Sequence, residues 1–115
     1  MSELFDTAKP LKLKRRKVFP REKDVEKYFM WRIKKAGGGQ WKWGSNGGTD
    51  RIVVIFGYHF FVELKAPDGR LRHNQKVVHK ALRDHGAEVH VVVGHKGVDE
   101  FIGVLNRTIP GIKVK

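Results

Sequence analysis

Two opposite charges end an apolar stretch of the chain at residues 59–65, HFFVELK, where Leu64 alone separates Glu63 from Lys65. A second carboxylate, Asp50, precedes the neighbouring apolar stretch. Two carboxylates that converge need a cation between them, and ligands made only of oxygen favour Mg²⁺ or Mn²⁺ over zinc or copper. Such an ion polarises a phosphodiester and activates water, and a lysine beside it orients that water or stabilises the developing negative charge. These residues therefore suggest metal-assisted phosphodiester hydrolysis.

Two β-strands joined by a tight turn are predicted to position the charges. Residues 50–56, DRIVVIF, and residues 59–65 read as the strands of a hairpin. Gly57 and Tyr58 lie between them, and glycine in the first position of a two-residue turn favours type II′.

The register of this hairpin decides whether the charges meet. A Gly57-Tyr58 turn places Phe56 opposite His59, and Asp50 then lies opposite Lys65 with Glu63 on the diagonal. Residues that oppose each other, and residues two apart on one strand, share a sheet face. A slip of one residue would separate Asp50 from the other two charges.

The remaining periodicity predicts an α/β fold, a single domain with a mixed β-sheet and flanking helices. Glycines at 37–39 end the first helix, and Gly86 ends the second. The expected elements besides the hairpin are a helix at 22–36, a short strand around Trp41 and Trp43, a helix at 74–85, a strand at 87–93 and a short helix at 97–105.

Polar residues on two of these helices could join the cluster. Glu26 lies at the edge of the apolar stripe of the first helix, and Glu22 lies one turn earlier. On the second helix, the predicted inward stripe is Val77, Val78, Ala81 and Leu82, and Gln75 falls on the same side. A buried amide needs partners, so Gln75 is either a site residue or a capping, structural amide.

Charge and composition limit the classes of function. The net charge is +12 with a pI of about 10.2, which favours nucleic acid as partner over an anionic membrane surface or no polyanion at all. The absence of cysteine excludes disulfides and thiolate zinc sites and suits a reducing, cytoplasmic compartment. No apolar run is long enough for a membrane span. Residues 1–20 read as a basic arm, with the folded domain at 21–115.

The motifs together resemble the VRR-NUC domain of the PD-(D/E)xK nuclease superfamily. The resemblance covers most of residues 21–102: an acidic helix in REKDVEKYFMWRIKKAGG, an aspartate in GGTDRIVVIF, the Glu-x-Lys of HFFVELK, and a glutamine on the next helix, in RHNQKVVHKAL. It implies a restriction-endonuclease-like core. The family's usual proline before the aspartate is Thr49 here, which alters the stiffness of that loop and leaves the ligand in place.

The resemblance implies a Mg²⁺- or Mn²⁺-dependent endodeoxyribonuclease and assigns roles to these residues. Stand-alone members resemble homodimers that act on branched DNA, including four-way junctions. Asp50 and Glu63 match metal ligands, with Glu26, or otherwise Glu22, as the helical acidic ligand. Lys65 matches the catalytic lysine and Gln75 the glutamine of the site. The Leu64 carbonyl is a further expected metal ligand, and the expected DNA contacts are Lys42, Arg70, Arg72, His73 and Lys76.

Two other interpretations stay open from the residues alone. Glu63 and Lys65 could form ordinary surface ion pairs, which are frequent and contribute little to stability. The chain could also be a basic nucleic-acid-binding module without catalysis. Against that module, carboxylates on a DNA-facing surface repel phosphate. The six histidines lack the paired spacing of a zinc site.

Overall fold

The structure is a computed structural model that describes residues 20–43 and 50–115, and it describes position 50 by its backbone alone. The predicted order of elements, a helix, two or three strands, a helix, a strand and a helix, is confirmed with three strands in the first run. The elements are α2 (Glu22–Lys35), β1 (Gly39–Lys42), β2 (Asp50–Ile55), β3 (Tyr58–Lys65), α3 (His73–Asp84), β4 (Val89–Val93) and α4 (Gly94–Thr108).

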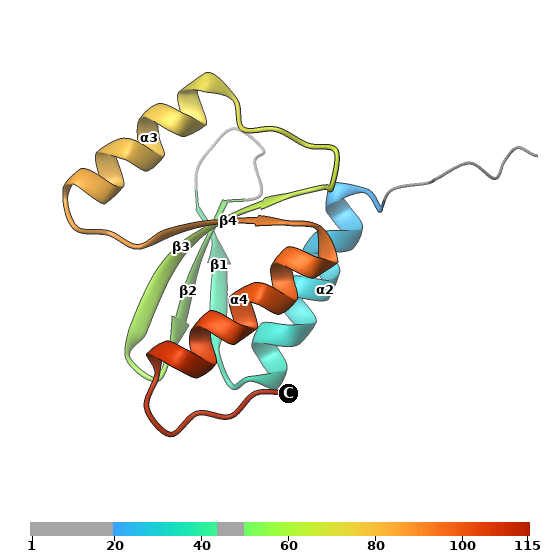
Figure 1. The fold of residues 1–115 in the computed structure, drawn as a ribbon, viewed down its shortest axis with the longest axis vertical. Helices are drawn as coiled ribbons and strands as arrows, with labels where there is room; N and C mark the ends of the chain where they lie inside the picture. Colours follow the sequence, from blue (N-terminus) through green and yellow to red (C-terminus); the bar gives the residue numbers. More distant parts are fainter. Residues whose placement is uncertain (1–19, 44–49) are drawn as a thin grey trace, which may run out of the picture.

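The four strands form one mixed sheet in the order β1-β2-β3-β4 (Figure 1). The β1–β2 and β2–β3 pairs are antiparallel, whereas β4 runs parallel to β3. A parallel pair needs a crossover connection, and α3 supplies it. The mixed sheet with flanking helices is therefore as predicted.

One face of the sheet carries the hydrophobic core. Alternate residues of β3, namely Phe60, Val62 and Leu64, point to this face and are buried together with residues of α2 and α4. On α2 the predicted apolar stripe is confirmed, since Val25, Phe29 and Ile33 are fully buried. Figure 1 shows α2 and α4 side by side on this face, with α3 on the other side of the sheet. The intervening β3 residues, which include both charges, therefore face α3.

The register of the hairpin differs from the prediction by two residues. Ile55 pairs with Tyr58, so the two turn residues are Phe56 and Gly57, and Asp50 pairs with Glu63. Both turn residues have positive φ, 49° and 83°, as a type I′ turn requires, whereas the predicted type II′ turn at Gly57-Tyr58 is wrong. A shift of two residues preserves the side-chain alternation, so positions 50 and 63 still share a face.

Helix α3 presents a different side to the sheet from the one predicted. Val77 and Val78 are 54% and 42% exposed, and Ala81 is exposed as well. The residue of α3 that is buried is His79. The predicted inward stripe is therefore wrong except for the half-buried Leu82. The apolar periodicity of α3 marks an exposed face, and its polar face packs inward.

The last helix is longer than predicted, because α4 begins at Gly94, directly after β4, and ends at Thr108. Its buried face includes Val98, Phe101 and Leu105, which pack into the core. Across the described residues, no helix combines the length and apolar character needed to cross a lipid bilayer.

Candidate active site

The backbone pairing of β2 and β3 places the three predicted site positions at the end of the hairpin away from the turn. Asp50, the first residue of β2, pairs directly with Glu63, and Lys65 lies two residues further along β3 on the same face. The side chains of Glu63 and Lys65 are only 1% and 7% exposed. Such burial excludes the surface ion pair considered above, because a buried charge is stable only with partners.

Among the described residues, three side chains approach the Glu63 carboxylate on the α3 side of the sheet. Gln75 Nε2 donates a hydrogen bond to Glu63 Oε2 over 3.0 Å. The Lys65 ammonium lies 3.6 Å from the same oxygen, an ion-pair distance. His79 Nε2 lies 3.6 Å from the other oxygen, Oε1, which is too long for a hydrogen bond. Strand β3 and helix α3 thus fix the orientation of this carboxylate.

Gln75 combines the two roles that the sequence left open. Its Oε1 accepts a hydrogen bond from the backbone N–H of Arg72 over 2.8 Å, which caps the start of α3. Its Nε2 points the other way, to Glu63. One side chain therefore fixes both the start of the helix and the carboxylate.

His79 is the site residue that the sequence interpretation missed. It lies four residues after Gln75, so both side chains lie on the same helix face. The histidine is buried, and its ring approaches Glu63 Oε1. The i, i+4 spacing of Gln75 and His79 was the available signal, but the apolar residues Val77 and Ala81 shifted the predicted inward stripe away from His79.

Glu63 offers an oxygen donor of the kind that a hard divalent cation binds. Glu63 Oε1 is buried, and no hydrogen bond reaches it from the described residues. A buried carboxylate oxygen without a hydrogen bond lowers the stability of the fold unless a cation or a hydrogen-bond donor binds it. Among the described residues, no three acidic or histidine side chains converge as a metal-binding group.

Glu26, the expected helical ligand, lies in a different environment. It forms an ion pair with the Arg51 guanidinium, whose other terminal nitrogen donates a hydrogen bond to Gln40 over 2.9 Å. Arg51 follows Asp50 on β2 and therefore points to the core face of the sheet. Burial lowers the pKa of Arg51, which stays charged near neutral pH. The structure thus places Glu26 against Arg51 and on the far face from Glu63.

Glu22 and the Leu64 carbonyl are the two further predicted ligands. Glu22 lies in the first turn of α2 and is half-buried. The Leu64 side chain is fully buried in the core. The roles of Glu22 and of the Leu64 carbonyl as ligands stay predictions. Thr49 and the basic arm, apart from Pro20, lie outside the described residues.

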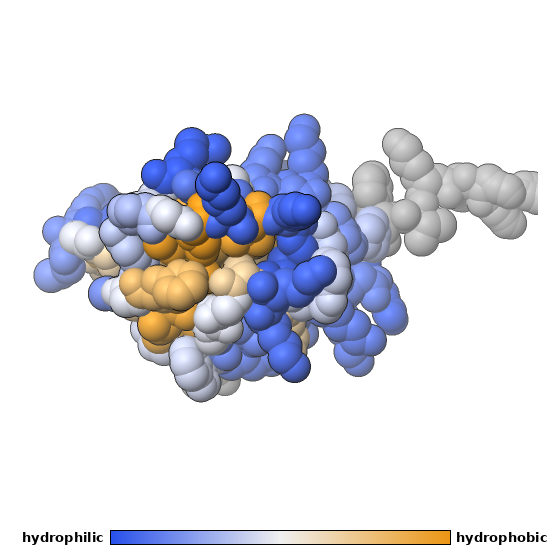
Figure 2. Space-filling model, turned by 90° about the horizontal axis from the view of Figure 1, so that it is seen from below, coloured by the Kyte–Doolittle hydropathy of each residue, from blue (hydrophilic) through white to orange (hydrophobic). Residues whose placement is uncertain are grey.

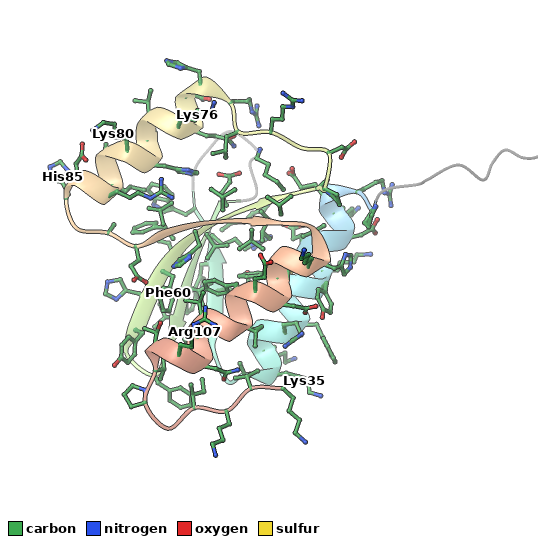
Figure 3. The ribbon with its side chains drawn as sticks, in the orientation of Figure 1. Lys35, Phe60, Lys76, Lys80, His85 and Arg107 are labelled. Atoms are coloured by element: carbon green, nitrogen blue, oxygen red, sulfur yellow. The ribbon has the colours of Figure 1, made fainter. Side chains whose placement is uncertain are left out.

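The five expected DNA contacts are all exposed: Lys42, Arg70, Arg72, His73 and Lys76. Four of them lie in the connection after β3 or in the first turn of α3, close in sequence to Gln75. Figure 3 shows Lys76 near the start of α3, projecting away from the sheet. Lys42 ends β1 and pairs with Arg51, so it lies one position from Asp50. The five basic residues are therefore close in sequence or in sheet register to Gln75 or Asp50.

Comparison with known proteins gives a match among solved structures. No protein-family model and no curated protein matches the chain. A solved structure titled "VRR_NUC domain" matches with a TM-score of 0.63 and 33% sequence identity, covering 71% of this chain and 94% of that one.

Proposed function

Since the chain belongs to the VRR-NUC domain family of nucleases, with the restriction-endonuclease-like fold that its motifs predicted, we propose that it is a Mg²⁺- or Mn²⁺-dependent endodeoxyribonuclease. The observation that carries the proposal is the buried Glu63 carboxylate. One of its oxygens is held by Gln75 and Lys65, and the other has no hydrogen bond from the described residues. This arrangement suits a metal ligand and is costly for a protein that only binds DNA.

Each residue of the site has a role in this proposal. Asp50 and Glu63 would hold the ion, which supplies a Lewis acid for the phosphodiester and stabilises charge in the in-line transition state. Lys65 places a positive charge where negative charge develops on the phosphate, and its ammonium can orient the attacking water. Gln75 and His79 orient Glu63 and are positioning residues.

Glu26 has a different role in the proposal from the one that the motif implies. Its carboxylate already neutralises the buried Arg51, and the sheet separates it from Glu63. We therefore assign Glu26 to the stability of the domain. Glu22 remains the candidate for a helical acidic ligand.

The substrate proposed is DNA, with selectivity for branched forms such as four-way junctions. A net charge of +12 steers a polyanion to the protein. The exposed Arg70, Arg72, His73 and Lys76 offer phosphate contacts beside Gln75.

We also propose that the chain forms a homodimer. Exposed apolar side chains on α3, Val77, Val78 and Ala81, form a stripe that the rest of the described chain leaves uncovered. Trp41 and Val91 are exposed on the sheet as well. Apolar surface of this kind favours a protein–protein contact.

Nicking assays on a four-way junction and on a linear duplex test the proposed activity. Wild type should cleave with Mg²⁺ or Mn²⁺ and not with EDTA, and Lys65→Ala should lose about two orders of magnitude or more of the rate. Lys96→Ala, which removes an exposed cation at the start of α4, is the control. Equal cleavage by Lys65→Ala, or no cleavage by wild type, would leave the non-catalytic DNA-binding module as the better interpretation.

A further inference from the structure

A large groove lies at the opposite end of the sheet from the candidate active site. It has a volume of about 1140 Å³ and is lined by α2, the β2–β3 turn and the C-terminal residues 109–115. Strand β3 has eight residues, so its ends are about 23 Å apart. Figure 3 shows Lys35, at the groove, and Lys76, beside Gln75, at opposite ends of the molecule.

The groove combines aromatic rings with positive charge. Seen from this end, Figure 2 shows an apolar patch surrounded by hydrophilic side chains. Among the described residues, none that lines the groove is acidic, and the adjoining Asp99 is paired with Arg32. Its exposed rings and lysines are Trp31, Phe56, Tyr58, Lys35, Lys113 and Lys115. Such a lining suits an anion that also carries flat apolar groups.

The stability of the fold does not explain why a phenylalanine occupies position 56. It occupies a turn position with φ of 49°, where asparagine or glycine is favoured and a bulky side chain is strained. Its side chain is 67% exposed, so the strain is not offset by burial. A Cβ added at Gly37 would lie 3.8 Å from the tip of the ring, so the ring leans toward the end of α2 and forms one side of the groove. A strained, exposed aromatic residue indicates a binding role.

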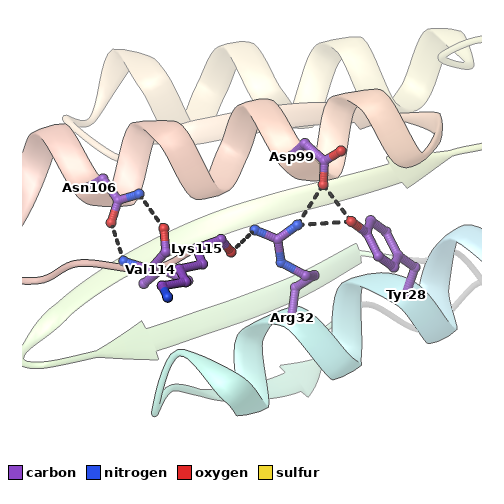
Figure 4. Close-up of polar contacts among 6 residues, drawn as sticks. All are labelled: Tyr28, Arg32, Asp99, Asn106, Val114 and Lys115. Carbon is purple, nitrogen blue, oxygen red and sulfur yellow. Dashed lines mark hydrogen bonds and ion pairs between the residues drawn. The ribbon is translucent and has the colours of Figure 1, made fainter.

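The opposite side of the groove is held in place by hydrogen bonds, as Figure 4 shows. Asn106 binds the backbone of Val114 twice, through Nδ2 to the carbonyl and through Oδ1 from the N–H, each over 2.8 Å. Arg32 donates to the Lys115 carbonyl over 2.5 Å and also contacts Tyr28 and Asp99. The C-terminal residues are therefore fixed against α2 and α4, and the groove is formed before any ligand binds.

We propose that this groove binds a single-stranded segment of nucleic acid. Bases would stack on Phe56, Trp31 and Tyr58 while the lysines contact phosphates. A single strand is favoured over a duplex because its bases expose the ring faces that stacking needs. The groove would hold an unpaired part of the substrate about 20 Å from the cleavage site. This proposal therefore rests on the proposed nuclease function. Binding itself requires neither metal nor cleavage.

The substitution Phe56→Asn separates binding from folding. Asparagine is favoured at this turn position, so the Tm should rise by roughly 2–5 °C. The affinity for a labelled oligo-dT, measured by fluorescence anisotropy in EDTA, should fall at least about five-fold because a stacking ring is lost. Phe56→Trp keeps a ring and should retain the affinity. The double variant Lys35→Gln with Lys113→Gln should reduce the salt dependence of log K by about 1.4.

Other outcomes would overturn the proposal. The first is unchanged affinity for oligo-dT in Phe56→Asn. The second is an equal loss of affinity for a blunt duplex in the same variant. The third is a groove that binds an acidic, phenylalanine-containing peptide and does not bind oligo-dT. Failure of the nuclease proposal is distinguishable from these results. In that case wild type cleaves nothing, yet oligo-dT binding still depends on Phe56.

Discussion

Gln75 Nε2 donates to Glu63 Oε2 over 3.0 Å and thereby ties the first turn of α3 to the charged end of β3. The same amide caps the helix through the N–H of Arg72. The position of the carboxylate thus depends on where α3 begins. A substitution at Gln75 is expected to change both metal binding at the site and the stability of α3, and the two effects can be measured separately.

We predict that Gln75→Ala weakens metal binding by about 10–100-fold, because the Glu63 carboxylate loses the donor that orients it. Ca²⁺, which needs no turnover to be detected, serves as the probe in a calorimetric titration. Loss of the helix cap should lower the free energy of unfolding by only about 1 kcal/mol. Lys80→Ala, on the exposed side of α3, is the control. Unchanged Ca²⁺ affinity in Gln75→Ala would contradict the positioning role.

The Asp50→Asn substitution tests the partner of Glu63 across the hairpin. We predict that cleavage is lost and that DNA binding is kept or improved, because the change removes a metal ligand and a negative charge near the phosphates. The rise in Tm that Mg²⁺ or Ca²⁺ causes in wild type should disappear. Asp68→Asn removes an equivalent charge from the exposed turn after β3 and should keep both cleavage and the metal effect. A variant that still cleaves would exclude Asp50 as a ligand.

The hairpin shows why the shared face could be predicted and the register could not. The two apolar strands and the intervening glycine are local signals. The turn, however, contains Phe56 at positive φ, and no local preference predicts phenylalanine there. The resulting error of two residues left Asp50 and Glu63 on one face, because side chains alternate with a period of two. An error of one residue would have separated them.

Helix α3 shows a limit of a different kind. Apolar periodicity assumes that the buried face is the apolar one. The inward partner of α3 at this point is the buried Glu63, so Gln75 and His79 face it and Val77 is left outside. The ion pair between Glu26 and Arg51 could not be predicted either, because no sequence pattern pairs charges on elements 25 residues apart. Both contacts involve polar groups whose partners are set by the tertiary fold.

Glu26→Gln should distinguish a structural carboxylate from a metal ligand. We predict a loss of about 3 kcal/mol in the free energy of unfolding, because the buried Arg51 is left without its counter-ion. The Ca²⁺ affinity of the folded fraction should be unchanged. Urea denaturation and calorimetry measure the two effects separately. Glu22→Gln is the paired variant, with little effect on stability expected and reduced Ca²⁺ affinity if Glu22 is the helical ligand. A stable Glu26→Gln protein that binds Ca²⁺ weakly would restore Glu26 to the metal site.

The exposed valines of α3 give a test of the proposed homodimer. Val77 is 54% exposed in the single chain, so Val77→Glu should change the stability of a monomer by no more than about 0.5 kcal/mol. In a symmetric dimer that buries this stripe, the same change introduces a charge on both sides of an apolar contact and should shift the protein to monomers. Sedimentation velocity measures the shift, and circular dichroism verifies that the chain stays folded. Val77→Thr, which keeps the branched shape without the charge, should remain mostly dimeric. A wild type that sediments as a monomer, or a Val77→Glu variant that stays dimeric, would show that the stripe does not mediate the proposed dimer.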